Sequence, residues 1–314
     1  MRSDDITLAQ LRALLAVRQE GSMTAASVKL GVTQPVLTRS LQQLERQMGV
    51  TLLRRSSRGA VLNEYGEALV ARARVVDQEL KRAFDEIGQM QGRLSGSVTI
   101  ACSHIPMMLF VPEAIGQLQQ NFPDVEVRII EGVYPQVLEE FRQGVLDFAI
   151  GPVPERGLGR DYKAARMLKA DMAIAVRKGH SHAKAKSLAE LKDLRWMIAG
   201  PMEGPGGLVK EVFAENGIQQ PATPIYLDTV WAAMEVVKHS NLVALIPKML
   251  VELASDEIDI ITVAENIEPI RIDVITAKMA ILTPAARALL SAVRASAMSW
   301  QNRADGAASR QVAA

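Results

Sequence analysis

The sequence predicts a winged helix-turn-helix at the N-terminus, then a long helix, then an α/β body. Three observations predict this order. Short, well-capped helical patterns fill the first sixty residues, a heptad repeat of apolar residues follows, and strand and helix patterns then alternate to the end. We place the domains at residues 1–63, 64–95 and 96–302, with a flexible tail at 303–314.

Composition indicates a folded chain whose charge is unevenly divided. Of 314 residues, 48% are hydrophobic and 23% charged, and no apolar run is long enough to span a membrane. There is no signal-peptide pattern, and the single cysteine excludes an internal disulfide, so we expect a cytoplasmic protein with no membrane partner. Residues 1–63 carry nine Lys and Arg against four Asp and Glu, whereas residues 94–314 carry 22 against 25. A basic head on an acidic body favours contact with a polyanion.

Three short helices are predicted in the head. An apolar stripe over residues 7–20 ends at a glycine, and Ser22 is placed to cap a second helix over residues 23–30. After a short turn, Thr33 is placed to cap a third helix, whose first turn holds Pro35. Two short helices joined by such a turn indicate a helix-turn-helix.

Polar side chains on the third helix are of the kind that bind base edges and phosphates. Strands at 52–55 and 60–62 would then form a β-hairpin wing carrying arginines. Together they predict DNA binding, with the third helix in the major groove; a helical dimerisation module is the alternative. The expected DNA-contacting residues are Ser22, Thr24, Thr33, Gln34, Pro35, Thr38, Arg39, Gln42, Arg54, Arg55 and Arg58.

Residues 64–94 predict one long helix that pairs with a second copy of the chain. Apolar residues recur at steps of four and three, as the a and d positions of a coiled coil do, and many of the other positions are charged. Such a helix needs a partner along its apolar seam. A helix lying on its own domain is the alternative. The expected dimerisation residues are Leu69, Ala73, Val76, Leu80, Ala83 and Ile87, with the seam continuing to Met90 and Leu94.

From Gly96 onward, alternating patterns predict one or two mostly parallel sheets covered by helices. Strands are expected at 97–101, 125–131, 146–151, 172–177, 196–199, 223–227 and 242–246. Helices are expected at 111–121, 136–143, 188–192, 207–216, 230–238 and 284–300.

Over nearly its full length the chain resembles the LysR-type transcriptional regulators. In the head, some fifty residues match in register, including Gly21-Ser22-Met23-Thr24-Ala25-Ala26, Gly31-Val32-Thr33-Gln34-Pro35 and Leu62-Asn63-Glu64-Tyr65-Gly66. The body resembles the family's effector domain at Gly96-x-Val98-x-Ile100, Phe122-Pro123-Asp124-Val125 and Leu146-Asp147-Phe148-Ala149-Ile150-Gly151. Within this family, short sequence segments of the body are most similar to those of the branch that responds to toluenesulfonate or sugars.

This resemblance implies a body like a periplasmic solute-binding protein. Its two α/β lobes would span about 97–167 with 269–302, and 168–268, with an effector cleft between them. It also implies a homodimer or homotetramer on promoter DNA, in which the effector changes DNA bending or contact with RNA polymerase. A cytoplasmic solute-binding sensor and an enzyme built on the α/β body are the alternatives.

Loops at strand ends are expected to line this cleft, because open α/β sheets bind ligands there. Helix N-termini aimed into a cleft attract carboxylates or sulfonates. We therefore expect the effector to be a small organic anion, and aromatic acids are included in this expectation. Glu203 would oppose an anion unless it faces solvent or binds a ligand hydroxyl. The expected effector-binding residues are Ser103, His104, Ile105, Val133, Tyr134, Gly151, Pro152, Pro201, Met202, Glu203, Thr229 and Val230.

Other motifs favour structural roles. His180-Ser181-His182 lacks a third metal ligand, which favours a solvated loop. Gly204-Pro205-Gly206-Gly207 lacks the Lys-Ser/Thr of a P-loop, which favours a turn before a helix. Cys102 is expected to be a buried small hydrophobe and not a redox sensor. Since no nucleophile–base pattern occurs, we expect no enzyme activity, metal or cofactor.

Overall fold

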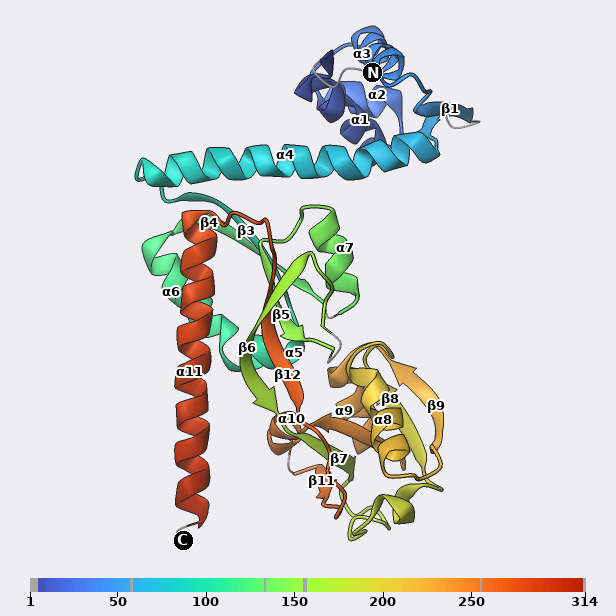
Figure 1. Cartoon of the computed structure of the whole chain (residues 1–314), viewed down its shortest axis with the longest axis vertical. Coiled ribbons are helices and arrows are strands. Elements are labelled where there is room, and N and C mark those ends of the chain that lie inside the picture. Colours follow the sequence, from blue (N-terminus) through green and yellow to red (C-terminus); the bar gives the residue numbers. More distant parts are fainter. Residues whose placement is uncertain (1–4, 57–58, 133, 155–156, 255, 313–314) are drawn as a thin grey trace. The chain divides into compact units, whose positions relative to one another are not determined.

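The structure, a computed structural model, describes residues 5–56, 59–132, 134–154, 157–254 and 256–312 (Figure 1). These residues form two compact units. The first comprises Met1–Gly88 with Glu140–Val145, and the second comprises Gln89–Glu139 with Leu146–Ala314. Among the described residues, no helix combines the length and apolar character that a membrane crossing requires.

The head folds as the three predicted helices, α1 (Leu8–Glu20), α2 (Met23–Lys29) and α3 (Gln34–Met48). They enclose an apolar core that includes Leu14, Leu37, Leu41 and Leu44. The hydroxyl of Ser22 caps α2 by accepting a hydrogen bond from the Ala25 N–H at 3.1 Å. The prediction for Thr33 is wrong in one respect. It occupies the N-cap position of α3, but its side chain makes no capping hydrogen bond, so its hydroxyl stays available.

The wing consists of β1 (Leu53–Ser56) and β2 (Gly59–Leu62), an antiparallel pair. The Glu45 carboxylate of α3 accepts hydrogen bonds from the N–H groups of Leu52, at 2.7 Å, and Leu53, at 3.2 Å. The wing is therefore tied to α3 by a charge-assisted contact.

The predicted long helix is α4 (Glu64–Met90), which begins where the wing ends. Asn63 Oδ1 accepts a hydrogen bond from the Gly66 N–H, while the Asn63 N–H donates to the Leu52 carbonyl. A Cβ on Gly66 would lie 2.3 Å from the Leu52 oxygen, so this close approach requires glycine. The helix ends at Met90, and Gly92 just beyond it takes a positive φ of 85°. The prediction that the seam continues to Leu94 is therefore wrong, because Leu94 lies outside the helix.

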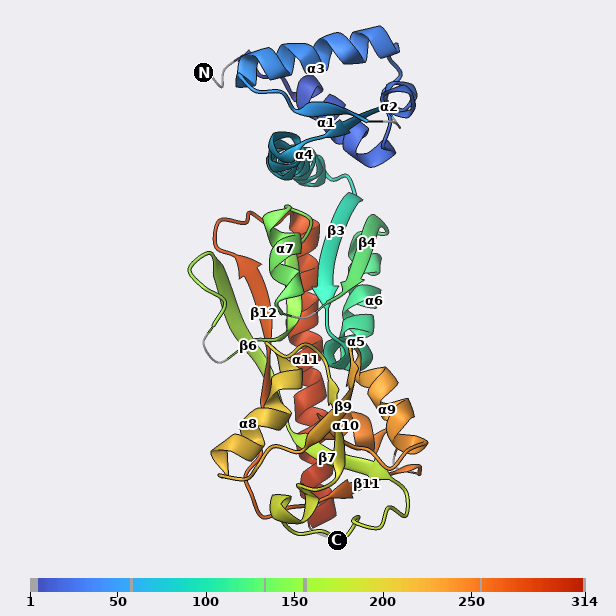
Figure 2. The same ribbon diagram turned by 90° about the vertical axis from the view of Figure 1, so that its right-hand side faces the viewer.

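The first lobe of the body is a five-stranded sheet in the order β4-β3-β5-β12-β6, which Figure 2 views from β4 on the right to β6 on the left. Strands β3 (Ser95–Cys102), β4 (Asp124–Glu131) and β5 (Phe148–Pro152) are parallel. Strand β12 (Ile270–Ala277) runs antiparallel to both β5 and β6 (Tyr162–Ala170). Helices α6 (Val111–Asn121) and α11 (Pro284–Val312) cover one face, and α7 (Gln136–Arg142) the other (Figure 1).

The second lobe is a five-stranded sheet in the order β11-β7-β10-β8-β9. Its strands are β7 (Met172–Arg177), β8 (Arg195–Ala199), β9 (Ala222–Leu227), β10 (Val243–Pro247) and β11 (Ile258–Ile261). Its helices are α8 (Leu208–Glu215), α9 (Val230–Lys238) and α10 (Lys248–Glu252), with two 3₁₀ turns at Leu188–Leu191 and Pro205–Gly207. Strands β8, β9 and β10 are parallel, whereas β7 is antiparallel to β10 and β11.

Several boundaries differ from the prediction. The expected helix at 188–192 is a 3₁₀ turn, and α5 (His104–Leu109), α10, β6, β11 and β12 were not expected. The first lobe extends to Ala170, because that residue pairs with Ile270 of β12. The expected flexible tail is helical as far as Val312, where α11 ends.

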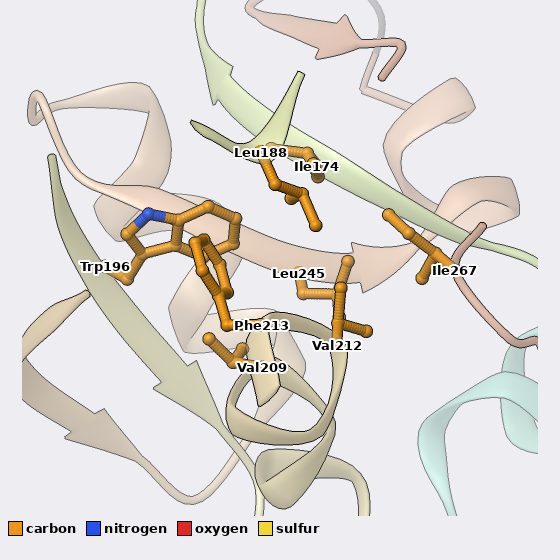
Figure 3. A pocket seen from close by; sticks show the side chains of 8 residues that line it. All are labelled: Ile174, Leu188, Trp196, Val209, Val212, Phe213, Leu245 and Ile267. Carbon is orange, nitrogen blue, oxygen red and sulfur yellow. The ribbon is translucent and has the colours of Figure 1, made fainter. Parts of the chain in front are cut away.

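The second lobe has its own core around Trp196 and Phe213, whose rings meet edge to face with centroids 5.1 Å apart. Figure 3 shows these rings with the apolar side chains around them, from β7, β10, α8 and the neighbouring turns. The space between these side chains does not admit a water molecule. This hollow is therefore packed core and not a ligand site.

We predict that Phe213→Ala, which truncates a side chain with 0% exposure, lowers the free energy of unfolding of the body by about 3–5 kcal/mol. The lost ring contacts and the cavity left behind both contribute. Chemical denaturation followed by tryptophan fluorescence measures the change. The control is Met279→Ala, at a side chain 90% exposed, which should change stability by less than about 0.5 kcal/mol. Equal effects of the two substitutions would contradict this account of the core.

Candidate functional sites: the helix-turn-helix face and the inter-lobe cleft

The outer face of α3 presents polar side chains on a rigid support. Gln34, Pro35, Arg39 and Gln42 are exposed, opposite the buried leucines of the same helix. Thr38 is half-buried and its hydroxyl donates to the Gln34 carbonyl at 2.9 Å. The structure thus brings together the predicted residues of α3 on one surface.

Side chains from α2 extend this face. The Thr24 hydroxyl donates to Gln34 Oε1 at 3.4 Å, which links α2 to the first turn of α3. Ser22 lies at the start of α2, where its hydroxyl is used for capping. Exposed Val36 adds an apolar group beside Gln34, of the type that contacts a thymine methyl.

The arginines of the head fall into two groups. Arg12 and Arg18 bind acidic residues of α4, at 2.7 Å to Asp77 and 2.9 Å to Glu67. Partial burial alone would raise the pKa of Asp77, but the hydrogen bonds and charges of Arg12 and Lys81 together lower it below its ordinary value. These two arginines therefore help to hold α4 against the head.

The second group lies on α3 and the wing. Arg39, Arg46 and Arg54 are exposed and form no ion pair with any part of the chain that the structure describes. Arg55 occupies a position on β1, and Arg58 lies outside the described residues. The positive charge that remains for a partner is thus concentrated on α3 and the wing.

The predicted seam of α4 is divided along its length. Leu69 packs against the head core and Ala73 is buried, so these two positions are already used within the chain. Farther along, Val76 is 49% exposed, Ile87 is 55% exposed and Ala83 is also exposed, while Leu80 is half-buried. Phe84, next to the seam, is exposed too. The second half of α4 therefore presents an apolar surface.

A cleft lies between the two lobes of the body, with about 530 Å³ of space including its open mouth. The first lobe contributes the ends of β3, β5 and β12, and the second contributes the ends of β7, β8 and β10 with the start of α9. Six predicted residues line it: Ser103, His104, Ile105, Pro152, Pro201 and Val230. The other lining residues, which the sequence did not predict, are Met172, Ala199, Gly200, Pro205, Asp228, Leu245, Pro247 and Ile270.

The other predicted cleft residues do not line this space. Thr229 is occupied as the cap of α9, where its hydroxyl accepts from the Ala232 N–H at 3.1 Å. Glu203 is exposed, Met202 lies beside it in the same turn, and Gly151 lies one residue deeper than Pro152. Tyr134 lies at the mouth, where its carbonyl oxygen would be 3.1 Å from a Cβ on Gly204. Val133 lies outside the described residues.

Two polar side chains stand at the lobe I wall of the cleft. His104 Nε2 lies 3.2 Å from Glu131 Oε1, so the imidazole has an acidic neighbour within contact distance. Ser103 is 5% exposed, and its hydroxyl oxygen is buried without a hydrogen-bond partner among the described residues. An unsatisfied buried hydroxyl beside a cleft is a candidate ligand contact, because leaving it unpaired costs free energy.

The remaining motifs have structural roles, but the expectation of a solvated loop at His180-Ser181-His182 is wrong for His180, which is buried. Burial raises the pKa of the Cys102 thiol to about 12, so the thiol is not poised for redox chemistry. Burial lowers the pKa of His180, whose ring lies 5.7 Å from that of His182. Within the described ranges no three His, Cys, Asp or Glu side chains form a metal site. The glycine-rich segment is a tight turn before α8, since a Cβ on Gly206 would lie 2.2 Å from the Gly200 oxygen.

Comparison with known proteins identifies both units. Residues 8–67 match the helix-turn-helix of the bacterial regulatory proteins of the lysR family, and residues 91–298 match the LysR substrate binding domain. The transcriptional regulator GbpR of Rhizobium radiobacter is 27% identical over 258 residues, covering 80% of this chain and 84% of that protein. GbpR of Azospirillum brasilense is 25% identical over 304 residues, covering 95% and 89%.

Solved structures show the same fold. CbnR, a LysR family transcriptional regulator, aligns with a TM-score of 0.66 at 21% identity, covering 93% of this chain and 99% of its own. Full-length CbnR complexed with its target DNA gives a TM-score of 0.67 at 21% identity, covering 93% and 100%. These relatives are transcriptional regulators and not enzymes or transport proteins. The chain therefore belongs to the LysR family of transcriptional regulators, with a helix-turn-helix head and an effector-binding body.

Proposed function

We propose that this regulator contacts double-stranded DNA through the exposed face of α3 and the wing. The observation that carries the proposal is the placement of Arg39 and Arg54, which form no ion pair within the described residues, while Arg12 and Arg18 are bound by α4. A related structure, CbnR, was solved with its target DNA. With DNA as its partner, the protein is expected to act in the cytoplasm.

On this proposal α3 lies in the major groove. Gln34, Thr38, Arg39 and Gln42 face base edges and neighbouring phosphates, with Pro35 in the first turn against the DNA. Ser22, Thr24 and Thr33 lie around the start of α3 as candidate phosphate contacts. Arg54, Arg55 and Arg58 of the wing reach the backbone or a minor groove.

The exposed half of the α4 seam supports a homodimer. Two copies that pair along Val76, Leu80, Ala83 and Ile87 bury apolar surface that the single chain leaves in water. The two heads then meet half-sites about 10 bp apart, or a multiple of that. Assembly to a tetramer and contact with RNA polymerase belong to the same proposal.

The inter-lobe cleft is proposed to bind a small organic effector that carries an anionic group. Val230 begins α9 at the cleft, where the first N–H groups of the helix have no partner within the helix. The unpartnered Ser103 hydroxyl faces the same space. Glu131, beside His104, repels an anionic group from that part of the lobe I wall, whereas Asp228 directly precedes the cap of α9 and adds a negative charge there. Closure of the lobes on the effector shifts the population of head arrangements, and so DNA bending.

Arg54→Ala should weaken binding to all duplexes and reduce the slope of log affinity against log salt by about 1, because one phosphate contact and its released counterion are lost. Fluorescence anisotropy with a duplex selected from a random pool, titrated with salt, measures both quantities. Arg18→Ala removes the same charge from the same head but from its α4 side, so it should leave the slope unchanged. An unchanged slope for Arg54→Ala would refute a phosphate contact at the wing.

Ala83→Glu should convert the dimer largely to monomer, because it places a charge in the paired seam. Sedimentation velocity at micromolar concentration reports the oligomeric state. The matched control is Ala71→Glu, the same change at an exposed position of α4 outside the seam, which should leave the dimer intact. If both variants sediment like the unchanged protein, pairing along α4 is wrong.

A further inference from the structure

Very few side chains set the charge of the inter-lobe cleft. Among the described residues that line it, His104 and Asp228 are the two with a titratable group, and none is a lysine or an arginine. The other residues of this lining are uncharged, and most of them are apolar. Within the described lining, His104 is therefore the side chain that can carry a positive charge.

The imidazole of His104 lies beside one carboxylate on the lobe I wall. His104 begins α5, just after the end of β3, and Glu131 is the last residue of β4, which pairs with β3. This register places His104 Nε2 at 3.2 Å from Glu131 Oε1. The His104 side chain is 24% exposed, so it is largely buried but still open to water. It can therefore gain or lose a proton in the folded protein.

The elements packed against α5 add no other charge at contact distance. These elements are β5, which has no titratable residue, α6 and α11. The described charged residues of the two helices are Glu113, Arg287, Arg294 and Arg303. All four are exposed, and Glu113 forms an ion pair with Arg303 at 3.7 Å. Within the described part of the chain, Glu131 is the residue that forms an ion pair with His104.

An anion anywhere in this cleft is close enough to respond to the charge on His104. The volume of 530 Å³ corresponds to a space roughly 8 Å across, which is about one Debye length at physiological salt. With a neutral imidazole, Glu131 and Asp228 both oppose an anion in the cleft. A protonated imidazole offsets the charge of Glu131 and attracts the anion, and the largely apolar walls screen this attraction less than water does.

We propose that His104 takes up a proton when the cleft binds its anionic effector, so that the regulator responds to the effector and to pH together. The bound anion stabilises the imidazolium, and by reciprocity the imidazolium strengthens binding of the anion. Histidine is the side chain whose charge ordinarily changes between pH 5 and 8. The affinity is therefore highest at the acidic end of this range and falls as the pH rises. The inference rests on the proposed anionic effector cleft and adds the regulation of that site.

Binding of small organic acids at two pH values tests the inference. The probes are benzoate, hexanoate, p-toluenesulfonate and hexanesulfonate, which stay ionised across the range, so that titration of the ligand contributes little. Isothermal titration calorimetry of the full-length protein measures each affinity at about pH 6 and about pH 8, on either side of the usual histidine titration. We expect at least one acid to bind about tenfold or more tightly at the lower pH.

The same instrument measures the proton itself. At about pH 7, where histidine is partly protonated, the titration is repeated in phosphate and in Tris, whose enthalpies of ionisation differ. The difference in measured heat gives the number of protons taken up for each ligand bound. We expect a net uptake of at most about one proton, because a single imidazole is protonated.

His104→Gln retains a polar side chain that cannot become charged. Its affinity at pH 8 should stay within about threefold of that of the unaltered protein, whereas the gain at pH 6 and the proton uptake should be lost. The control is His239→Gln, the same change at an exposed histidine after α9 and outside the described lining, which should keep both. Glu131→Gln should raise the affinity at pH 8, because it removes an opposing charge, an effect that loss of a purely structural contact would not produce.

Val230→Trp shows where the acid binds. Val230 is half-buried in the lining, so the larger side chain fills the cleft from lobe II and should abolish binding. Equal affinities at both pH values, abolished by this substitution, would reject the proton uptake and leave the effector cleft standing. A pH dependence that survives His104→Gln would assign the proton to another group and reject the role of His104. Binding that survives Val230→Trp, or no binding by any acid at either pH, would reject both the anionic effector cleft and this inference.

Discussion

The antiparallel insertion of β12 between β5 and β6 is the constraint on which the body depends. This strand enters lobe I only after the chain has passed through the whole of lobe II, so the sheet closes over a long stretch of sequence. Ile272 and Val274 on one face of β12 complete the core beneath α6 and α11. One strand therefore completes the packing of lobe I and, through Ile270, contributes to the wall of the cleft.

Because of this insertion, the two lobes lie next to each other and both line the cleft. The chain leaves lobe I after Ala170 and returns at Ile270, and these two residues pair with each other in the sheet. The lobes are thus joined by two adjacent crossings, an arrangement that allows hinge motion about one line. A ligand that contacts lobe I at Ser103 and lobe II at Val230 favours the closed arrangement by its differential affinity. Effector recognition and conformational change then share the same contacts.

Local sequence patterns were sufficient for the head and for the parallel part of the body. The caps and apolar spacing of α1 to α3 act within a few residues, and α6 and α9 begin and end where periodicity predicted. The antiparallel strand β7 was also predicted, because it is a continuous apolar run that is buried. Strands β6, β11 and β12 were missed, since their pairing is antiparallel to partners distant in sequence and no helix separates them in an alternating rhythm. The exposed residues of β6 also blur the strand pattern.

The sequence predicted only part of the cleft, and strand direction again decided which part. Residues that follow parallel strands, such as Ser103 and Pro152, were found because strand ends of one sheet meet at one edge. Met172, Leu245 and Ile270 were not, because they reach the cleft through antiparallel pairing.

On the function proposed above, a ligand bound in the body changes the arrangement of the two heads on DNA. Fluorescence energy transfer between dyes at the two ends of a selected operator duplex measures this directly, with the full-length protein bound and with an organic acid added that calorimetry shows to bind the protein. The transfer efficiency should change on addition of the acid. An efficiency that stays constant for the unaltered protein, at a concentration where calorimetry shows the ligand bound, would contradict coupling between cleft and DNA.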